Sequence, residues 1–139
     1  MRTVMGRDAL AEFLEREFPQ VADEFTVEAV APMAVTVRLN TQEKHLRPGG
    51  TVSGPTMFAL ADVAIYLAVL AMIGPKALAV TTNCSIDFMR KPAAGRDLIC
   101  EARLLKLGRA LAVGDAMIRS DGQEGVVARA GLTYSIPPR

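Results

Sequence analysis

An apolar run that contains a single acid is the stretch of this sequence with the clearest chemical potential. Residues 49–74 read GGTVSGPTMFALADVAIYLAVLAMIG, and Asp62 is the only charged residue among them. A buried carboxylate needs partners, and one that lines a cleft can act as a general base or a nucleophile. A purely structural alternative is also open, in which the Tyr66 hydroxyl, one helical turn further on, satisfies Asp62.

The run begins with Ser53-Gly54-Pro55, a sequence typical of a helix start. Ser53 is suited to cap the helix, and Gly54 and Pro55 occupy its first positions. Free N–H groups and the positive end of the helix dipole meet here, and Gly54 lets a ligand approach the backbone closely. Pro55 has no N–H, so the Gly54 amide is the donor that could hold an anion or a developing oxyanion. Ordinary capping is the alternative.

The spacing of these two features is informative. Gly54 and Asp62 lie eight residues apart, about 12 Å along a helix axis. One subunit cannot easily bring both groups to one reacting carbon, whereas two antiparallel helices at a two-fold axis can. The spacing therefore predicts a site in which Gly54 of one subunit faces Asp62 of the other.

The hydrophobic pattern around the run predicts an α+β domain. Residues 1–139 are expected to form a single domain in which residues 1–20 are an N-terminal helical extension. The period of the apolar residues predicts a short amphipathic helix, two strands, a polar loop, the apolar helix and then an antiparallel meander of longer strands. The predicted ranges are helix 8–18, strands 25–31 and 33–40, loop 41–53, a helix ended by Gly74-Pro75, and strands 78–89, 97–107, 110–119 and 125–136.

Composition excludes several classes of function. The chain has 16 basic and 15 acidic residues without a basic stripe, and few aromatic residues, so no nucleic-acid partner is expected. Cys84, Cys100 and the single His45 form no metal-binding pattern, so no metal is expected and the thiols are predicted to be free in a reducing, cytoplasmic setting. Asp62 argues against a membrane span. A helix that is apolar on all sides needs cover beyond one sheet, which predicts a homodimer.

Two segments resemble a known family. The stretches RPGGTVSGPTMFALADVAIYLAVLA and AVTTNCSIDFMRKPAAGRDLICEARLLKLGRALAVGDAMI are similar to the hotdog-fold acyl-CoA thioesterases of the phenylacetic acid degradation type, over about residues 20–136. The resemblance implies a curved antiparallel β-sheet wrapped around one long central α-helix, in a homodimer or a homotetramer. It also implies hydrolysis of an acyl-CoA, with coenzyme A as part of the substrate and no separate cofactor.

The resemblance also implies roles for individual residues. Gly54 matches the oxyanion donor and Asp62 the acid, as general base or nucleophile, while Thr81 aligns with a hydroxyl that positions the attacking water. Asn83, two residues on, is expected on the same face of its strand as Thr81. The residues expected at the substrate are Arg47, Ser53, Pro55, Phe58, Tyr66, Asn83, Arg90 and Lys91, of which the last two match the place where such enzymes meet the phosphates of coenzyme A.

The chain departs from the family pattern at two places. Ser53-Gly54-Pro55 stands where the family usually has His-Gly-Gly, and Arg47 stands where it often has Asn. These departures leave open an alternative from another class, a non-catalytic acyl-CoA or small-ligand binding protein on the same scaffold. For the enzyme, aryl, short-chain and medium-chain acyl groups all remain open.

Overall fold

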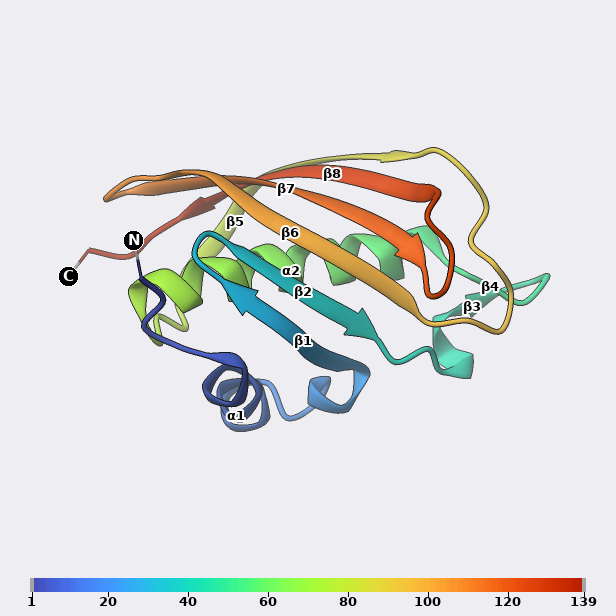
Figure 1. Cartoon of the computed structure of the whole chain (residues 1–139), viewed down its shortest axis with the longest axis horizontal. Helices are drawn as coiled ribbons and strands as arrows, with labels where there is room; N and C mark the ends of the chain where they lie inside the picture. Colours follow the sequence, from blue (N-terminus) through green and yellow to red (C-terminus); the bar gives the residue numbers. More distant parts are fainter. Residues whose placement is uncertain (1, 139) are drawn as a thin grey trace.

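The apolar helix predicted from the sequence is the axis of the fold. The computed structural model, which describes residues 2–138, places α2 (Gly54–Ile73) under a curved six-stranded sheet (Figure 1). The Ser53 side chain caps the helix by accepting a hydrogen bond from the Thr56 N–H. Gly74 ends it with a φ of 95°, a conformation that glycine adopts readily. Both predicted boundaries are confirmed.

The remaining elements also follow the predicted order. The strands of the main sheet run antiparallel in the order β1-β2-β6-β7-β8-β5, and α1 precedes them in the chain. Their bounds are α1 Arg7–Glu17, β1 Phe25–Ala31, β2 Ala34–Leu39, β5 Val80–Phe88, β6 Leu98–Leu107, β7 Leu111–Ser120 and β8 Val126–Ser135, with a 3₁₀ turn η1 at Ala22–Glu24.

The prediction that all the later strands form one meander is wrong for β5. Strands β6, β7 and β8 are consecutive neighbours, but β5 pairs with β8 at the edge of the sheet, and β2 lies beside β6. The connection 89–97 is long enough for this crossing. Nine extended residues span about 30 Å, and three strand spacings need only about 14 Å.

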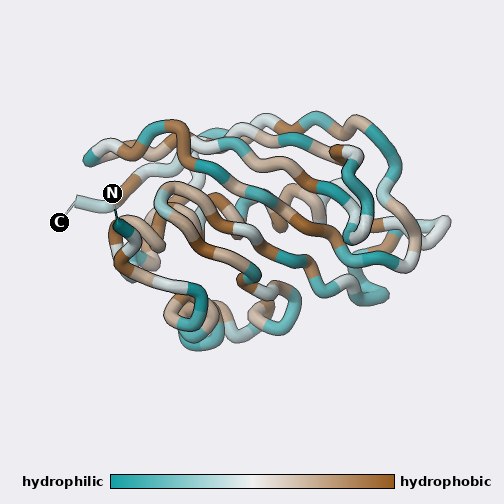
Figure 2. Tube along the Cα trace, viewed as in Figure 1, coloured by the Kyte–Doolittle hydropathy of each residue, from teal (hydrophilic) through white to brown (hydrophobic). Residues whose placement is uncertain are grey.

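The chain itself supplies much of the cover for α2. Hydrophobic residues follow the helix beneath the sheet (Figure 2), and every residue from 64 to 71 is buried. On the side away from the sheet, the rings of Phe13 and Phe18 pack on Tyr66, with centroids 6.3 and 5.7 Å away. The Val4 N–H donates to the Ala71 carbonyl near the end of the helix. For this half of α2, the cover beyond the sheet therefore comes from the chain itself and not from a second copy.

The first half of α2 keeps an uncovered stripe. Pro55, Phe58 and Ala59 are exposed, with Phe58 at 38%, and Asp62 and Val63 are half-buried. By length and composition alone α2 could cross a membrane, since an 18-residue stretch of it has a mean hydropathy of 2.2, but 61% of that stretch is buried inside the protein, as expected of a core helix. A second copy stays the predicted cover for this stripe.

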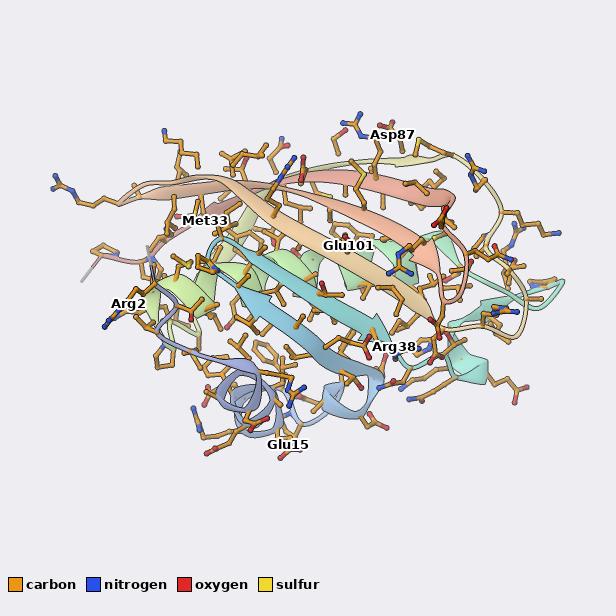
Figure 3. All side chains as sticks on the ribbon, in the orientation of Figure 1. Arg2, Glu15, Met33, Arg38, Asp87 and Glu101 are labelled. Carbon is orange, nitrogen blue, oxygen red and sulfur yellow. The ribbon has the colours of Figure 1, made fainter. Side chains whose placement is uncertain are left out.

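A network of ion pairs around Arg38 stabilises one end of the sheet. Arg38 lies toward the end of β2 (Figure 3), and its guanidinium donates to Glu28, Asp97 and Asp121 at 3.0, 3.0 and 2.8 Å. These bonds, the one to Asp121 foremost, hold the pKa of Arg38 above its usual value. Asp97 also accepts from the Thr41 N–H, so the network positions the start of the segment that leads to α2.

That segment, residues 41–53, is more ordered than the predicted loop. It holds a 3₁₀ turn η2 (Glu43–His45) and a two-stranded ribbon of β3 (Leu46–Arg47) and β4 (Thr51–Val52). Gly49 and Gly50, at φ 102° and 79°, form the turn between the two strands. The ribbon was not predicted because two-residue strands leave no detectable period.

A buried histidine fixes this segment to the body of the protein. The Gln42 N–H donates to His45 Nδ1 at 2.9 Å, so Nε2 carries the hydrogen and donates to Glu24 at 2.7 Å. The His45 carbonyl in turn accepts from the Ser53 N–H at 2.9 Å, directly before α2. Burial raises the pKa of Glu24, but the bonds from His45 and Lys44 outweigh it, so the net pKa is lowered. This chain of contacts positions the first turn of α2.

Gly114 in β7 is expected to be sensitive to a single added methyl group. A Cβ there would lie 2.8 Å from Ile65 Cδ1 in α2 and 2.9 Å from the Arg103 carbonyl oxygen in β6. We expect Gly114→Ala to lower the free energy of unfolding by about 1–3 kcal/mol. Gly131→Ala is the matched control, because a Cβ there meets nothing within 4 Å. Denaturant unfolding measures both variants, and an equal loss in the two would contradict this packing.

Glu24→Gln tests the anchor of the segment through its pH dependence. Folding lowers the pKa of Glu24, so its negative charge stabilises the folded protein at a pH above the pKa of the unfolded chain, about 4.3. This contribution is lost as the pH falls through the pKa of Glu24 in the folded protein. We therefore expect wild type to be more stable than Glu24→Gln at pH 7 and the two to converge in acid. Urea unfolding between pH 3 and 7 measures this. A gap that does not change with pH would contradict it, and the exposed Glu12→Gln serves as control.

Candidate active site

Asp62 is held by two hydroxyl groups of the sheet. Thr81 Oγ1 donates to Asp62 Oδ1 at 2.5 Å, and Tyr134 Oη donates to the same oxygen at 2.6 Å. Thr81 in β5 and Tyr134 in β8 are direct partners in the strand register, which places their side chains next to each other facing α2. The edge of the sheet thus holds one oxygen of the carboxylate in place.

The structural pair of Asp62 with Tyr66 is contradicted. The Tyr66 hydroxyl donates its single hydrogen to the Ala77 carbonyl at 3.1 Å, and its ring packs beside Tyr134 with centroids 6.0 Å apart. Burial, and second the charge of Glu17, raises the pKa of Tyr66 to about 12. Tyr66 therefore stays neutral, and it lies near Asp62 without donating a hydrogen bond to it.

The second oxygen of Asp62 opens into a pocket. Oδ2 makes no hydrogen bond within the described chain. Among residues 2–138, every buried side-chain oxygen or nitrogen has a hydrogen-bond partner. An oxygen without a partner, such as Oδ2, must therefore be accessible. The pocket has a volume of about 330 Å³ and predominantly apolar walls, to which α1 and the turn after it contribute. It is lined by Leu14, Phe18, Val21, Asp62, Val63, Tyr66, Ala77, Ala79, Val80, Thr81 and Tyr134.

The Gly54 amide is free at the start of α2, as predicted. The Thr56 N–H is used by the Ser53 side chain, the Met57 N–H by the Ser53 carbonyl, and Pro55 has none. For the Gly54 N–H, no acceptor is recorded in the described part of the chain. The ring of Phe88 lies close to Gly54. A Cβ added to this glycine would be 3.2 Å from Phe88 Cζ.

Three cationic side chains share a pocket with Gly54. Arg47, Arg90 and Lys91 lie around this second pocket, which has a volume of about 610 Å³ and includes Phe88 in its wall. Arg90 Nε donates to the Val126 carbonyl at 2.9 Å. No ion pair joins any of the three to an acid among residues 2–138. Their charges therefore add to the positive end of the helix dipole, which suits an anion.

Within one chain the two pockets stay apart. They share no lining residue, and Asp62 and Gly54 lie on α2 about 12 Å apart along its axis. This separation agrees with a site built from two subunits, which stays a prediction. Over residues 2–138, no group of three or more His, Cys, Asp or Glu side chains could hold a metal ion.

Asn83 does not share a face with Thr81, so that prediction is wrong. Thr81 pairs with Tyr134, but Asn83 pairs with Thr133, the neighbour of Tyr134 whose side chain points the opposite way. A bulge between Thr81 and Asn83 adds one residue and interrupts the two-residue period. Asn83 is consequently exposed, and its predicted contact with substrate would have to be made on the outer face.

The other predicted substrate residues lie outside both pockets or are used locally. The Ser53 hydroxyl donates to Thr56 Oγ1 at 3.0 Å and accepts from the Thr56 N–H, as a helix cap does. Pro55 and Phe58 are exposed on the uncovered stripe of α2. Their contact with substrate stays a prediction.

Sequence reasoning missed Tyr134, Phe18 and Phe88. A signal for Tyr134 was present, because the last strand alternates and places Leu132, Tyr134 and Ile136 on one apolar face. A buried tyrosine needs a partner for its hydroxyl, and Asp62 is the one acid within the apolar core run. Phe18 and Phe88 gave no comparable signal, since their positions depend on how separate elements pack.

Comparison with known proteins gives consistent matches. The model of the Thioesterase superfamily matches residues 49–127, a span that includes Gly54, Asp62 and Thr81. Human acyl-coenzyme A thioesterase 13 is 29% identical over 97 residues, which cover 70% of this chain and 69% of that protein.

Two solved structures extend the likeness beyond the matched span. A provisionally assigned thioesterase from Silicibacter is 62% identical, with a TM-score of 0.93 over 99% of this chain and 96% of that one. A mutant of the phenylacetic acid degradation protein PaaI from Thermus thermophilus is 28% identical, with a TM-score of 0.72 over 86% of this chain and 99% of that one.

Proposed function

The chain belongs to the thioesterase superfamily and has its hotdog fold, and from this premise we propose that it hydrolyses acyl-CoA thioesters to a carboxylic acid and free coenzyme A. The observation that carries the proposal is the different environment of the two carboxylate oxygens of Asp62. One of its oxygens is held by two hydroxyl groups, and the other is open to an apolar pocket. The likeness to the human relative, an acyl-coenzyme A thioesterase, supports the choice of substrate.

The reaction needs an oxyanion donor and a base. The Gly54 N–H, at the positive end of α2, donates to the carbonyl oxygen of the thioester as negative charge develops there. Asp62 Oδ2 of the opposing subunit takes a proton from water, whose oxygen adds to the carbonyl carbon; the carbon–sulfur bond then breaks, and the thiolate leaves and is protonated. Thr81 already donates its hydrogen to Oδ1, so its oxygen can accept the second hydrogen of that water.

Direct attack by Asp62 on the thioester is the other route. It passes through an anhydride with the carboxylate, whereas the water route does not. A single turnover in ¹⁸O-labelled water identifies direct attack in which water opens the anhydride at Asp62 Cγ, because the product then carries an unlabelled Asp62 oxygen and Asp62 keeps the label. We propose the water route, because Thr81 supplies an acceptor for the attacking water beside the open oxygen.

The coenzyme end of the substrate suits the second pocket. Coenzyme A carries phosphate groups, and Arg47, Arg90 and Lys91 offer positive charges around Gly54 with no acid to neutralise them in the described chain. We propose that the phosphates lie beside these three cationic side chains and the thioester lies at the Gly54 amide. We propose no cofactor beyond the coenzyme A of the substrate.

The acyl group suits the pocket beside Asp62. Its walls include the rings of Phe18, Tyr66 and Tyr134, and Leu14 and Val21 close it from the side of α1. A pocket of about 330 Å³ favours a small aryl or a short- or medium-chain acyl group over a long chain. Aromatic side chains offer edge and face contacts to an aryl group. The likeness to the Thermus phenylacetic acid degradation protein also favours an aryl group.

Asp62→Asn removes the base and keeps the shape of the side chain. We expect kcat/KM to fall by about 10²–10⁴-fold, with the oligomeric state unchanged in size-exclusion chromatography. Release of free thiol from acetyl-, hexanoyl-, benzoyl- and phenylacetyl-CoA measures turnover. Tight binding of these compounds by wild type without thiol release would instead support the non-catalytic binding protein, and normal turnover by Asp62→Asn would refute the mechanism.

Gly54→Pro tests the amide donor, because proline is the residue that lacks the N–H. Ser53, at ψ 156°, already has the extended backbone that a following proline requires. We expect loss of kcat for Gly54→Pro. Gly54→Ala is the matched control, since it adds the same Cβ against Phe88 but keeps the N–H, and should retain more activity.

Mixing the two inactive variants tests whether the site spans two subunits. Suppose that each site takes Gly54 from one subunit and Asp62 from the other. A dimer of one Gly54→Pro chain and one Asp62→Asn chain then has one site with both substitutions and one intact site. We expect co-refolded mixtures to regain up to about a quarter of wild-type activity, since about half the dimers are mixed and each has one intact site. No recovery despite confirmed mixed dimers would show that both groups act within one chain.

The cationic pocket is tested by comparing two thioesters. Arg47→Gln and Lys91→Gln should each raise KM for an acyl-CoA by about 2- to 10-fold and weaken its dependence on salt, because phosphate contacts are lost. The same acyl group on N-acetylcysteamine has no phosphate, so its kcat/KM should be unaffected. An equal effect on both substrates would contradict phosphate binding at these residues.

A further inference from the structure

The two oxygens of Asp62 have different surroundings within the folded chain. Oδ1 receives hydrogen bonds from Thr81 and Tyr134, while Oδ2 opens into the apolar pocket. Tyr134 also approaches the backbone carbonyl of Asp62 at 2.9 Å, so its hydroxyl meets both the side chain and the main chain of this residue. A single hydroxyl hydrogen favours the shorter of the two contacts, the one to Oδ1 at 2.6 Å.

We infer that Tyr134 is a positioning residue for the proposed hydrolysis: its hydroxyl holds Asp62 through Oδ1, so that Oδ2 is the oxygen presented to water. The ring has little freedom to move, since only 2% of Tyr134 is exposed and β7 and β5 pair with its strand on either side. A carboxylate held through one oxygen cannot rotate to exchange its two oxygens without breaking both donor bonds. The sheet therefore decides which oxygen reacts.

The donor stays protonated through the pH range of the reaction. Burial, and second the charge of Asp62, raises the pKa of Tyr134 well above its usual value. The other titratable groups around Asp62 are Tyr66, the Cys84 thiol and, on the far side of Tyr66, the acid Glu17, whose charge acts on Tyr66. Tyr66 donates to Ala77, and burial followed by the charge of Asp62 raises the pKa of the Cys84 thiol. In the described chain no ion pair is recorded for Asp62, so hydroxyl groups provide its stabilisation.

Tyr134→Phe is the direct test, and Tyr66→Phe is its matched control. Both substitutions remove a phenolic oxygen from the wall of one pocket, but only the first removes a bond to Asp62. We expect Tyr134→Phe to lower kcat about 10- to 100-fold, because a bond to a charged group is lost, with little change in KM. The acid limb of its pH–rate profile should move to higher pH, since a carboxylate with one donor fewer holds its proton more tightly. In Tyr66→Phe the acid limb should stay in place.

A second measurement tests the inference without turnover. The Asp62 carboxyl carbon is titrated by ¹³C NMR, with Asp62→Asn used to assign its signal, in wild type, Tyr134→Phe and Tyr66→Phe. We expect the midpoint to rise in Tyr134→Phe alone. An unchanged midpoint, or a loss of kcat in Tyr134→Phe with the acid limb in place, would overturn the positioning role. If wild type hydrolyses no acyl-CoA, the proposed function fails, and the titration still decides whether Tyr134 holds Asp62.

Discussion

A carboxylate in an apolar helix is the constraint on which the arrangement of this protein depends. Asp62 lies midway along α2, where burial without partners would cost several kcal/mol. The helix offers it none, because its neighbours are apolar and the Tyr66 hydroxyl is used by Ala77. The sheet resolves this by placing Thr81 and Tyr134 opposite each other in β5 and β8, both donating to one oxygen. Satisfying that oxygen leaves the other one free for chemistry.

The two halves of α2 are covered differently, and this divides their roles. The second half is covered by the sheet, by the rings of Phe13 and Phe18 and by the N-terminal segment, so it is the buried part of the helix. The first half keeps an exposed stripe that includes Phe58 and ends at Asp62. A stripe of this kind next to an incomplete site is what a second subunit would cover, so the same surface explains both the proposed dimer and the proposed shared site.

The segment before α2 also positions the start of the helix and the Arg47 side chain. The contacts from Glu24 through His45 to Ser53 fix where the helix begins, and the short ribbon of β3 and β4 brings Arg47 to the side of Gly54. The segment that follows β5, an edge strand of the main sheet, brings Arg90 and Lys91 to the same pocket. The Gly54 amide therefore lies within a group of positive charges that no single stretch of sequence contains. The departures from the family pattern, Ser53 and Arg47, serve here as a cap and as one of these charges.

The sequence by itself determined the elements, the class of fold and the two chemical groups proposed for the centre of the site. Periodicity located α2 and its cap, the residue types and the resemblance pointed to Gly54 and Asp62, the resemblance pointed to Thr81, and the separation of about 12 Å between the first two predicts a site shared by two subunits. Only the tertiary structure decided the partners of Asp62, because Tyr134 reaches it across 72 residues of chain through strand pairing. It also decided the place of β5, the cover from α1 and the outward turn of Asn83, since crossovers and bulges depend on packing between elements and leave no local period.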